Sequence, residues 1–156
     1  MQGINVAEMG HVVNIVPPVD ITGGVTGDRF SMENYAHATI LVQVGVSAAA
    51  WTKIILRECD AETSGTATDI AFNLYAEETA AGDTLGAREA VAATGRTPSA
   101  NNSIMYVIEL DARQLSDGFK WVELALTNGS NSVIASAVAI LSGSRYGQTL
   151  SPTAIA

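Results

Sequence analysis

The stretch "HATILVQVGV" at residues 37–46 decides the fold class, because its side chains alternate in character. Successive residues of a β-strand face opposite ways, and β-branched residues are favoured in strands. Here the two faces are Ile40, Val42 and Val44 against Thr39, Leu41 and Gln43. The pattern predicts a half-buried strand.

The same period of two recurs along most of the chain. We expect further strands at residues 53–58, 69–77, 88–92, 104–110, 120–126 and 133–141. Turn-forming residues separate them, and the cluster "TNGSNS" at 127–132 is short enough to join two strands as a hairpin. The helical signal is a single turn in "DARQLSDG" at 111–118, where Asp111 would cap the turn and Gly118 would stop it.

About eight or nine short strands and almost no helix predict an all-β protein. Their regular spacing indicates an antiparallel β-sandwich, and the long connections between them favour a jelly roll over a simple meander. We expect a sandwich domain over residues 20–143, with an extended N-terminal arm over 1–19 and an extended C-terminal arm over 144–156.

Composition narrows the class of partner. The 156 residues carry a formal net charge of −8, from 16 acidic and 8 basic residues, so we expect no direct binding to nucleic acid. Charged residues make up only 15%, well below the usual quarter, which is typical of a protein that partners cover. Residues 1–16 lack the basic start of a signal peptide, and the longest apolar stretch, at 133–141, is too short to span a membrane. We therefore expect a soluble protein, made in the cytoplasm, with no membrane partner.

Candidate catalytic residues are few. A nucleophile–histidine–carboxylate set would have to use His11 or His37, and no G-x-S-x-G turn supports one. Cys59 lies between Glu58 and Asp60, whose charges raise the pKa of a thiol and oppose thiolate formation. These observations favour surface histidines and a structural cysteine, so we expect neither enzymatic activity nor a cofactor.

A metal site is also not expected. Glu58, Asp60 and Glu62 alternate in "ECDAE" and could approach a calcium ion through their oxygen atoms. The stretch lacks the glycine and the terminal glutamate of an EF-hand loop, and a solvated acidic turn is the more typical interpretation.

The two tryptophans are the candidates for a sugar-binding surface, which would require an exposed ring. Trp51, after "SAAA", would either display its ring as a platform for a carbohydrate or cover the end of the core, and we favour the core. Trp121 lies in a strand between Phe119 and Val122, so we expect it to be buried.

The two ends of the chain are the strongest candidates for an interface. The N-terminal arm is apolar in places and would need to pair with a sheet, its own or that of another subunit. The C-terminal arm carries Arg and Tyr, which often anchor interfaces. The candidate interface residues are Val12, Val13, Ile15, Val16, Arg145, Tyr146, Pro152 and Ile155.

Residues 27–156 resemble a family of small virion proteins of tailed bacteriophages. The resemblance is carried by "FSMENY" at a strand entry, by "DGFKWV" at a second strand, and by the closing "LSGSRYGQTLSPTAI". The matching positions are Phe30, Ser31, Asn34, Tyr35, Gly118, Phe119, Val122, Leu141, Gly143, Arg145, Tyr146, Gln148, Pro152, Ala154 and Ile155.

This resemblance implies a capsid decoration (cement) protein, which would bind the outside of an assembled phage capsid and stabilise it. It implies the major capsid protein and further copies of this chain, as a dimer or trimer, as partners, and the capsid surface of the virion as the location. Two alternatives remain open at this point. One is a carbohydrate- or receptor-binding module of a phage head or tail fibre, and the other is a neck or tail structural component.

Overall fold

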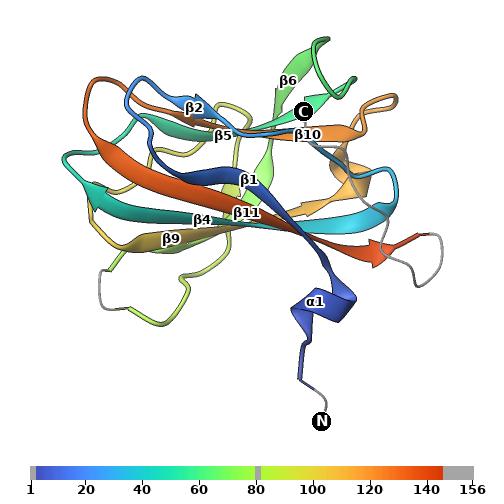
Figure 1. Ribbon diagram of the computed structural model, residues 1–156, viewed down its shortest axis with the longest axis horizontal. Helices are drawn as coiled ribbons and strands as arrows, with labels where there is room; N and C mark the ends of the chain where they lie inside the picture. The colour runs from blue at the N-terminus through green and yellow to red at the C-terminus, as the bar shows by residue number, and fades with distance from the viewer. Residues whose placement is uncertain (1–2, 80–81, 146–156) are drawn as a thin grey trace.

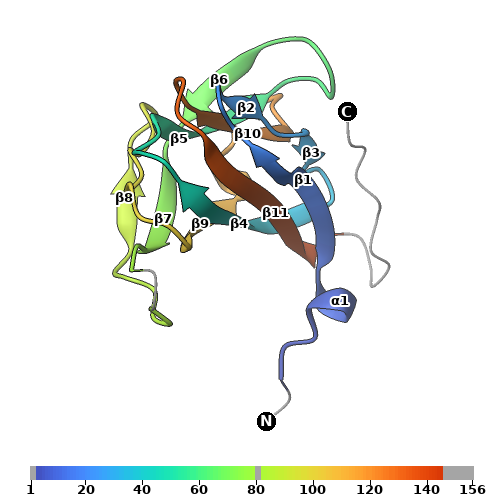
Figure 2. The ribbon, with the colours of Figure 1, turned by 60° about the vertical axis from the view of Figure 1, so that its left-hand side comes forward.

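The computed structural model describes residues 3–79 and 82–145, which form two antiparallel β-sheets packed face to face (Figures 1 and 2). The helical elements are α1 (Val6–Met9) and the 3-10 turn η1 (Ala112–Gln114). The strands are β1 (His11–Asp20), β2 (Val25–Thr26), β3 (Phe30–Ser31), β4 (Tyr35–Ser47), β5 (Lys53–Cys59), β6 (Ala67–Ile70), β7 (Phe72–Glu77), β8 (Glu89–Val91), β9 (Ile104–Asp111), β10 (Trp121–Thr127) and β11 (Val133–Ser144).

The strand order is that of a jelly roll. One sheet has six strands in the order β1-β11-β4-β9-β7-β8, and the other has five, in the order β2-β10-β5-β6 with β3 also paired to β10. The strand pairs are nested in the chain, from the outermost pair inward: β1 with β11, β2 and β3 with β10, β4 with β9, and β5 with β6. Such nested pairing across two sheets defines a jelly roll, and the β7–β8 hairpin extends it. The predicted all-β antiparallel sandwich is confirmed.

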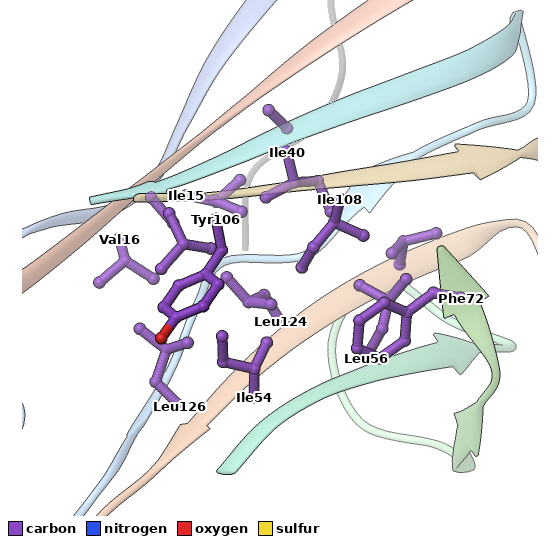
Figure 3. Packing of buried hydrophobic residues seen from close by; sticks show 14 of the residues in the cluster. Ile15, Val16, Ile40, Ile54, Leu56, Phe72, Tyr106, Ile108, Leu124 and Leu126 are labelled. Carbon is purple, nitrogen blue, oxygen red and sulfur yellow. The ribbon is translucent and has the colours of Figure 1, made fainter. Parts of the chain in front are cut away.

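The core lies between the two sheets and follows the period-two pattern (Figure 3). Ile40 and Ile108 point inward from the six-stranded sheet, Leu56 and Leu124 point inward from the five-stranded sheet, and all four are fully buried. Burying one such side chain stabilises the fold by about 1.5–3 kcal/mol. Tyr106 brings a hydroxyl into this region, and the hydroxyl donates to the Glu78 carboxylate (2.7 Å).

The N-terminal arm is part of the sandwich, which corrects the predicted domain boundary at residues 19 and 20. β1 pairs with β11 in antiparallel register from His11↔Leu141 to Asp20↔Ile134, with irregularities between Asn14 and Val19. The apolar residues of β1 gain burial by joining the open edge of β11. Its two prolines are tolerated because they lie in an edge strand with bulges, where a missing N–H costs little.

Two other expectations about connections were wrong. Residues 69–77 form two strands, because the chain crosses from one sheet to the other at Ala71, between β6 and β7. Residues 127–132 join β10 to β11, which belong to different sheets, so the connection is a crossover rather than a hairpin. Jelly-roll wiring requires both crossings, and turn-forming residues alone do not reveal them.

The helical content is small, as expected, but is distributed differently. The predicted turn after Asp111 is the 3-10 turn η1, where the Asp111 backbone N–H donates to the Gln114 side chain (2.8 Å). The one-turn helix α1 was not expected, and it extends below the six-stranded sheet in Figure 1. Among the described residues, no helix is long and apolar enough to cross a membrane.

Candidate interaction surface

The outer face of the five-stranded sheet carries a network of paired charges beside the half-buried side chains of Ile55 and Trp121. Arg29 donates through Nε to Glu123 Oε2 (2.9 Å), and Arg57 donates to both Asp69 Oδ1 (2.8 Å) and Glu123 Oε1 (3.3 Å). Glu123 is only 6% exposed, so its charge depends on the two guanidinium groups that contact it. Arg29 also donates through Nη1 to the carbonyl of Ala61 (2.9 Å), which attaches the loop after β5 to this face. The groups of this network satisfy one another within the chain.

The outer face of the six-stranded sheet is apolar along its middle. Val138, Leu41, Val107 and Tyr75 are register partners across β11, β4, β9 and β7, and all four point away from the core. We call these four residues the outer apolar row. The exposed side of an antiparallel sheet is normally polar. A row of this kind is therefore typical of a surface that another molecule covers.

The apolar character continues to both ends of this face. Ile140 and Ile134 are further outward residues of β11, on either side of Val138, and Ile134 is 39% exposed. A hollow of about 440 Å³ lies at the Ile134 end, with Met105 and Pro18 among its walls. The outer apolar row thus crosses the middle of the sheet, and the face is also partly apolar toward each end of β11.

A second hollow, of about 480 Å³, lies at the opposite end, under α1. We call it the α1 groove, and its lining residues are Ile4, Val6, Met9, Gly10, Thr39, Ile140, Ser142 and Gly143. None of the eight is charged.

The N-terminal wall of the α1 groove is unusually exposed. Ile4 is 83% exposed, Met9 63% and Val6 39%, and α1 buries none of its residues. Val12, at the start of β1, adds a further apolar side chain at 51% exposure. A helix of one turn has little stability of its own. This wall would gain stability from a partner that covers it.

Gly10 allows α1 to lie close to the sheet. A Cβ atom at Gly10 would come within 2.9 Å of Ile140 Cγ2 and 3.3 Å of the Leu141 carbonyl oxygen. The Gly10 N–H donates to the Val6 carbonyl (2.9 Å) and closes the single turn. The position of the wall beside β11 therefore depends on a residue without a side chain.

His37 lies beside the α1 groove, between two carboxylates of β9. Its Nε2 is 2.6 Å from Glu109 Oε2, its Nδ1 is 3.2 Å from Asp111 Oδ1, and the Thr39 hydroxyl donates to Glu109 (2.7 Å). Burial lowers the pKa of His37, but the two carboxylate hydrogen bonds outweigh it, so the pKa is raised. Ser142 is the register partner of His37 on β11, yet both ring nitrogens are engaged by β9. In this arrangement the imidazole is held as an ion-pair partner and offers no free nitrogen to Ser142 as a base.

The predicted interface residues of the N-terminus separate into two groups. Val13, Ile15 and Val16 are 2%, 1% and 1% exposed and belong to the core, so their assignment to an interface is corrected. Val12 points outward from the same strand and remains a candidate. The bulge near Ile15 turns both Ile15 and Val16 inward, and strict alternation could not have shown this.

Of the predicted C-terminal residues, the structure describes only Arg145. It is exposed, and its backbone N–H donates to the Asn34 carbonyl (2.9 Å), which continues the β11–β4 pairing beyond Ser144. Tyr146, Pro152 and Ile155 lie outside the described residues.

Both tryptophans were expected to be buried, and only Trp51 is. Trp51 is 1% exposed and belongs to the core, so the interpretation favoured from sequence is confirmed and Trp51 offers no platform for a sugar. Its indole N–H is buried without a hydrogen-bond partner among the described residues. Trp121 is half-buried, on the outer face of the five-stranded sheet, so its expected burial was wrong.

The acidic stretch after β5 does not converge on a metal. Glu58 points into the protein, where it is 3% exposed and accepts the Ser116 backbone N–H (2.7 Å), whereas Asp60 accepts the Thr66 N–H (2.8 Å). The described residues include no group of three or more His, Cys, Asp or Glu side chains arranged to hold a metal ion. Burial, and then the charge of Glu123, raises the pKa of the Cys59 thiol to about 11, which fits a structural cysteine.

The outer apolar row was not identified from sequence, although a signal was present. In residues 37–46 and 133–141 both alternating sets contain large apolar residues, for example Leu41 opposite Ile40 and Val138 opposite Ala139. Apolar residues on both faces of a strand are typical of a sheet that is covered on both faces. That signal was interpreted only as evidence for a core.

Comparison with known proteins adds little to these observations. No protein-family model matches the sequence, and no curated protein is significantly similar to it. Among solved structures, the chain is similar to one titled "Crystal structure of SPBc2 prophage-derived protein YomS", with a TM-score of 0.46 and 13% sequence identity. The similarity covers 85% of this chain and 95% of that one. A likeness of this extent supports no inference about function.

Proposed function

We propose that this protein is a non-enzymatic structural component of a tailed-phage virion that binds the outside of the assembled capsid and stabilises it. The observation that carries the proposal is the contrast between the two outer faces. One face satisfies its charges internally, and the other presents the outer apolar row between two hollows. The resemblance of residues 27–156 to small virion proteins supplies the biological setting.

The six-stranded sheet is the side that contacts the major capsid protein. Covering the row removes apolar surface from water, which contributes about 25 cal/mol per Å². A protein that binds only the assembled shell stabilises that shell by mass action, by about 2.7 kcal/mol per site at a free concentration 100 times the Kd. The five-stranded sheet, with its paired charges, then faces solvent. The net charge of −8 suits the outside of a shell that encloses DNA.

A glycan- or receptor-binding role on a fibre is the weaker proposal. Its motivating observation was an exposed ring at Trp51, and Trp51 is buried. A neck or tail position would use the same apolar face, and particle composition distinguishes it from a capsid position.

The test uses phage particles made with and without the protein. Particles would be heated while DNA release is followed, and purified protein would be added back to the deficient particles. Two matched variants sharpen the assay: Leu41→Ser on the outer apolar row and Ile55→Ser, a half-buried residue on the outer face of the five-stranded sheet.

We expect wild-type protein and Ile55→Ser to bind and to raise the release temperature, and Leu41→Ser to do neither. Deficient particles as heat-resistant as complete ones would contradict the proposal. Full activity of a folded Leu41→Ser protein would contradict the choice of face.

A further inference from the structure

The α1 groove lacks the features of a small-molecule site. Small-ligand pockets combine apolar walls with a few placed polar groups that fix orientation. The polar side chains that line this groove are Thr39 and Ser142, and the Thr39 hydroxyl already donates to Glu109. Its apolar wall is the exposed N-terminal segment. These properties suit an uncharged peptide segment with apolar side chains.

The chain itself contains a segment of that chemistry. Residues 146–156, "YGQTLSPTAIA", carry no charged side chain. Their larger apolar residues are spaced by small and polar ones: Tyr146, Leu150, Pro152 and Ile155. Fully extended, a segment of this length reaches at most about 40 Å. That reach is more than enough to cross from one molecule to an adjacent one.

The position where the described chain ends favours the groove of a neighbour. β11 runs through Ser142 and Gly143, which line the groove, and pairing with β4 continues to the hydrogen bond between Arg145 and Asn34. The chain therefore leaves past the end of the sheet, at the same end as α1 (Figure 2). Ser142 and Gly143 already line the groove, so residues 146–156 could fill the groove of their own chain only by turning back toward β11, whereas the groove of a neighbour can be approached from another direction.

We propose that residues 146–156 of one copy bind in the α1 groove of a neighbouring copy. The contact is heterologous, since a tail on one molecule meets a groove on another. Two copies that exchange tails form a dimer, and copies that pass tails in one direction form a closed ring. The proposal does not depend on a capsid, so it can be tested on the purified protein alone.

The first experiment is sedimentation of the full-length chain over a range of concentrations. It would be compared with a chain that ends at residue 145, which retains all the strands that the structure describes, and with the groove variants Met9→Glu and Ile140→Asn. Ile134→Asn is the matched control, because Ile134 and Ile140 both point outward from β11 but Ile134 lies at the far end. Met9 is 63% exposed, so its substitution leaves the fold intact.

We expect the wild-type and Ile134→Asn chains to associate. Tail removal should abolish association, and each groove variant should weaken it by about tenfold or more. A wild-type chain that is monomeric up to millimolar concentration would overturn the proposal. A tail-less chain that associates like wild type would overturn it as well.

The second experiment mixes two chains that are each defective. The chain ending at residue 145 keeps an intact groove, and the Met9→Glu chain keeps an intact tail. A complex that forms only in the mixture would show that a tail of one molecule fills the groove of another. If circular dichroism showed both chains to be folded and no complex formed, the proposal that a tail binds the groove of another copy would be overturned.

Discussion

The two outer faces of this sandwich are built from the same kind of strands and differ in what they leave unsatisfied. On the five-stranded sheet, Arg29, Arg57, Glu123 and Asp69 form ion pairs with one another, so these charges need no partner from another molecule. On the six-stranded sheet, the outer apolar row still has burial to gain at Val138, Leu41 and Tyr75, which are partly exposed. Val107, within the row, is already buried. The charges of the five-stranded face are satisfied within the chain, and this difference is the basis for our proposal that a partner covers the six-stranded face.

The largest effect on stability is expected from Glu123→Ala. The substitution leaves the partly buried guanidinium of Arg29 and one donor of Arg57 without their anionic partner, and breaking a buried pair in this way costs about 3 kcal/mol or more. Urea unfolding measures the loss, and self-association should be unchanged in the folded fraction. A change below 1 kcal/mol would mean that the charges on this face do not depend on one another.

Leu41→Ser should separate stability from binding. Leu41 is half-buried on the outer face, so we expect a loss of roughly 1 kcal/mol or less in the free energy of unfolding, with loss of particle binding. Urea unfolding and co-sedimentation with particles measure the two effects. A loss of about 3 kcal/mol would instead identify Leu41 as a core residue.

The pH dependence of stability should come in part from His37. Its pKa is raised in the folded state, so its stabilising contribution is complete below the unfolded pKa and is lost as pH rises through the folded pKa. The side chains of His37 and Glu109 are each about one-third exposed, so we expect this pair to contribute a few tenths to about 1 kcal/mol. Unfolding of wild type and His37→Gln from pH 5 to pH 9 measures it. If the stability of the two proteins depended on pH in the same way, His37 would not be a source of the pH dependence.

The smallest effect is expected from Lys120→Ala. Lys120 Nζ lies 3.0 Å from Glu33 Oε1, but both side chains are about half exposed, and such surface pairs contribute little. The change in unfolding free energy should lie within about 0.5 kcal/mol. An effect as large as that of Glu123→Ala would remove the distinction between a connected charge network and an isolated pair.

The fold was largely predictable because alternation is local. The strand over residues 37–46 and the strand over 133–141 both follow from side chains two positions apart. The partners of each strand are not local. Thus β1 was predicted as an arm outside the sandwich domain, with the sheet that it pairs with left open, and the chain crossing at Ala71 was missed. Both depend on which strand edge is open elsewhere in the molecule.

The candidate surface was predictable only in part, for the same reason. Val12 could be identified from its apolar character in the N-terminal segment. The row through Leu41 and Val107 exists only because the registers of β11, β4, β9 and β7 align four residues that are far apart in sequence. The charge network around Glu123 likewise joins residues from separate strands and a loop.

Oxidative footprinting of the protein on particles and in free solution tests the central claim most directly. Tyr75 and Met105 point outward from the six-stranded sheet, whereas Trp121 is a half-buried ring on the opposite face and serves as the internal control. We predict that particle binding protects Tyr75 and Met105 and leaves the oxidation of Trp121 unchanged. Protection of Trp121, with Tyr75 and Met105 as reactive as in free protein, would contradict the account.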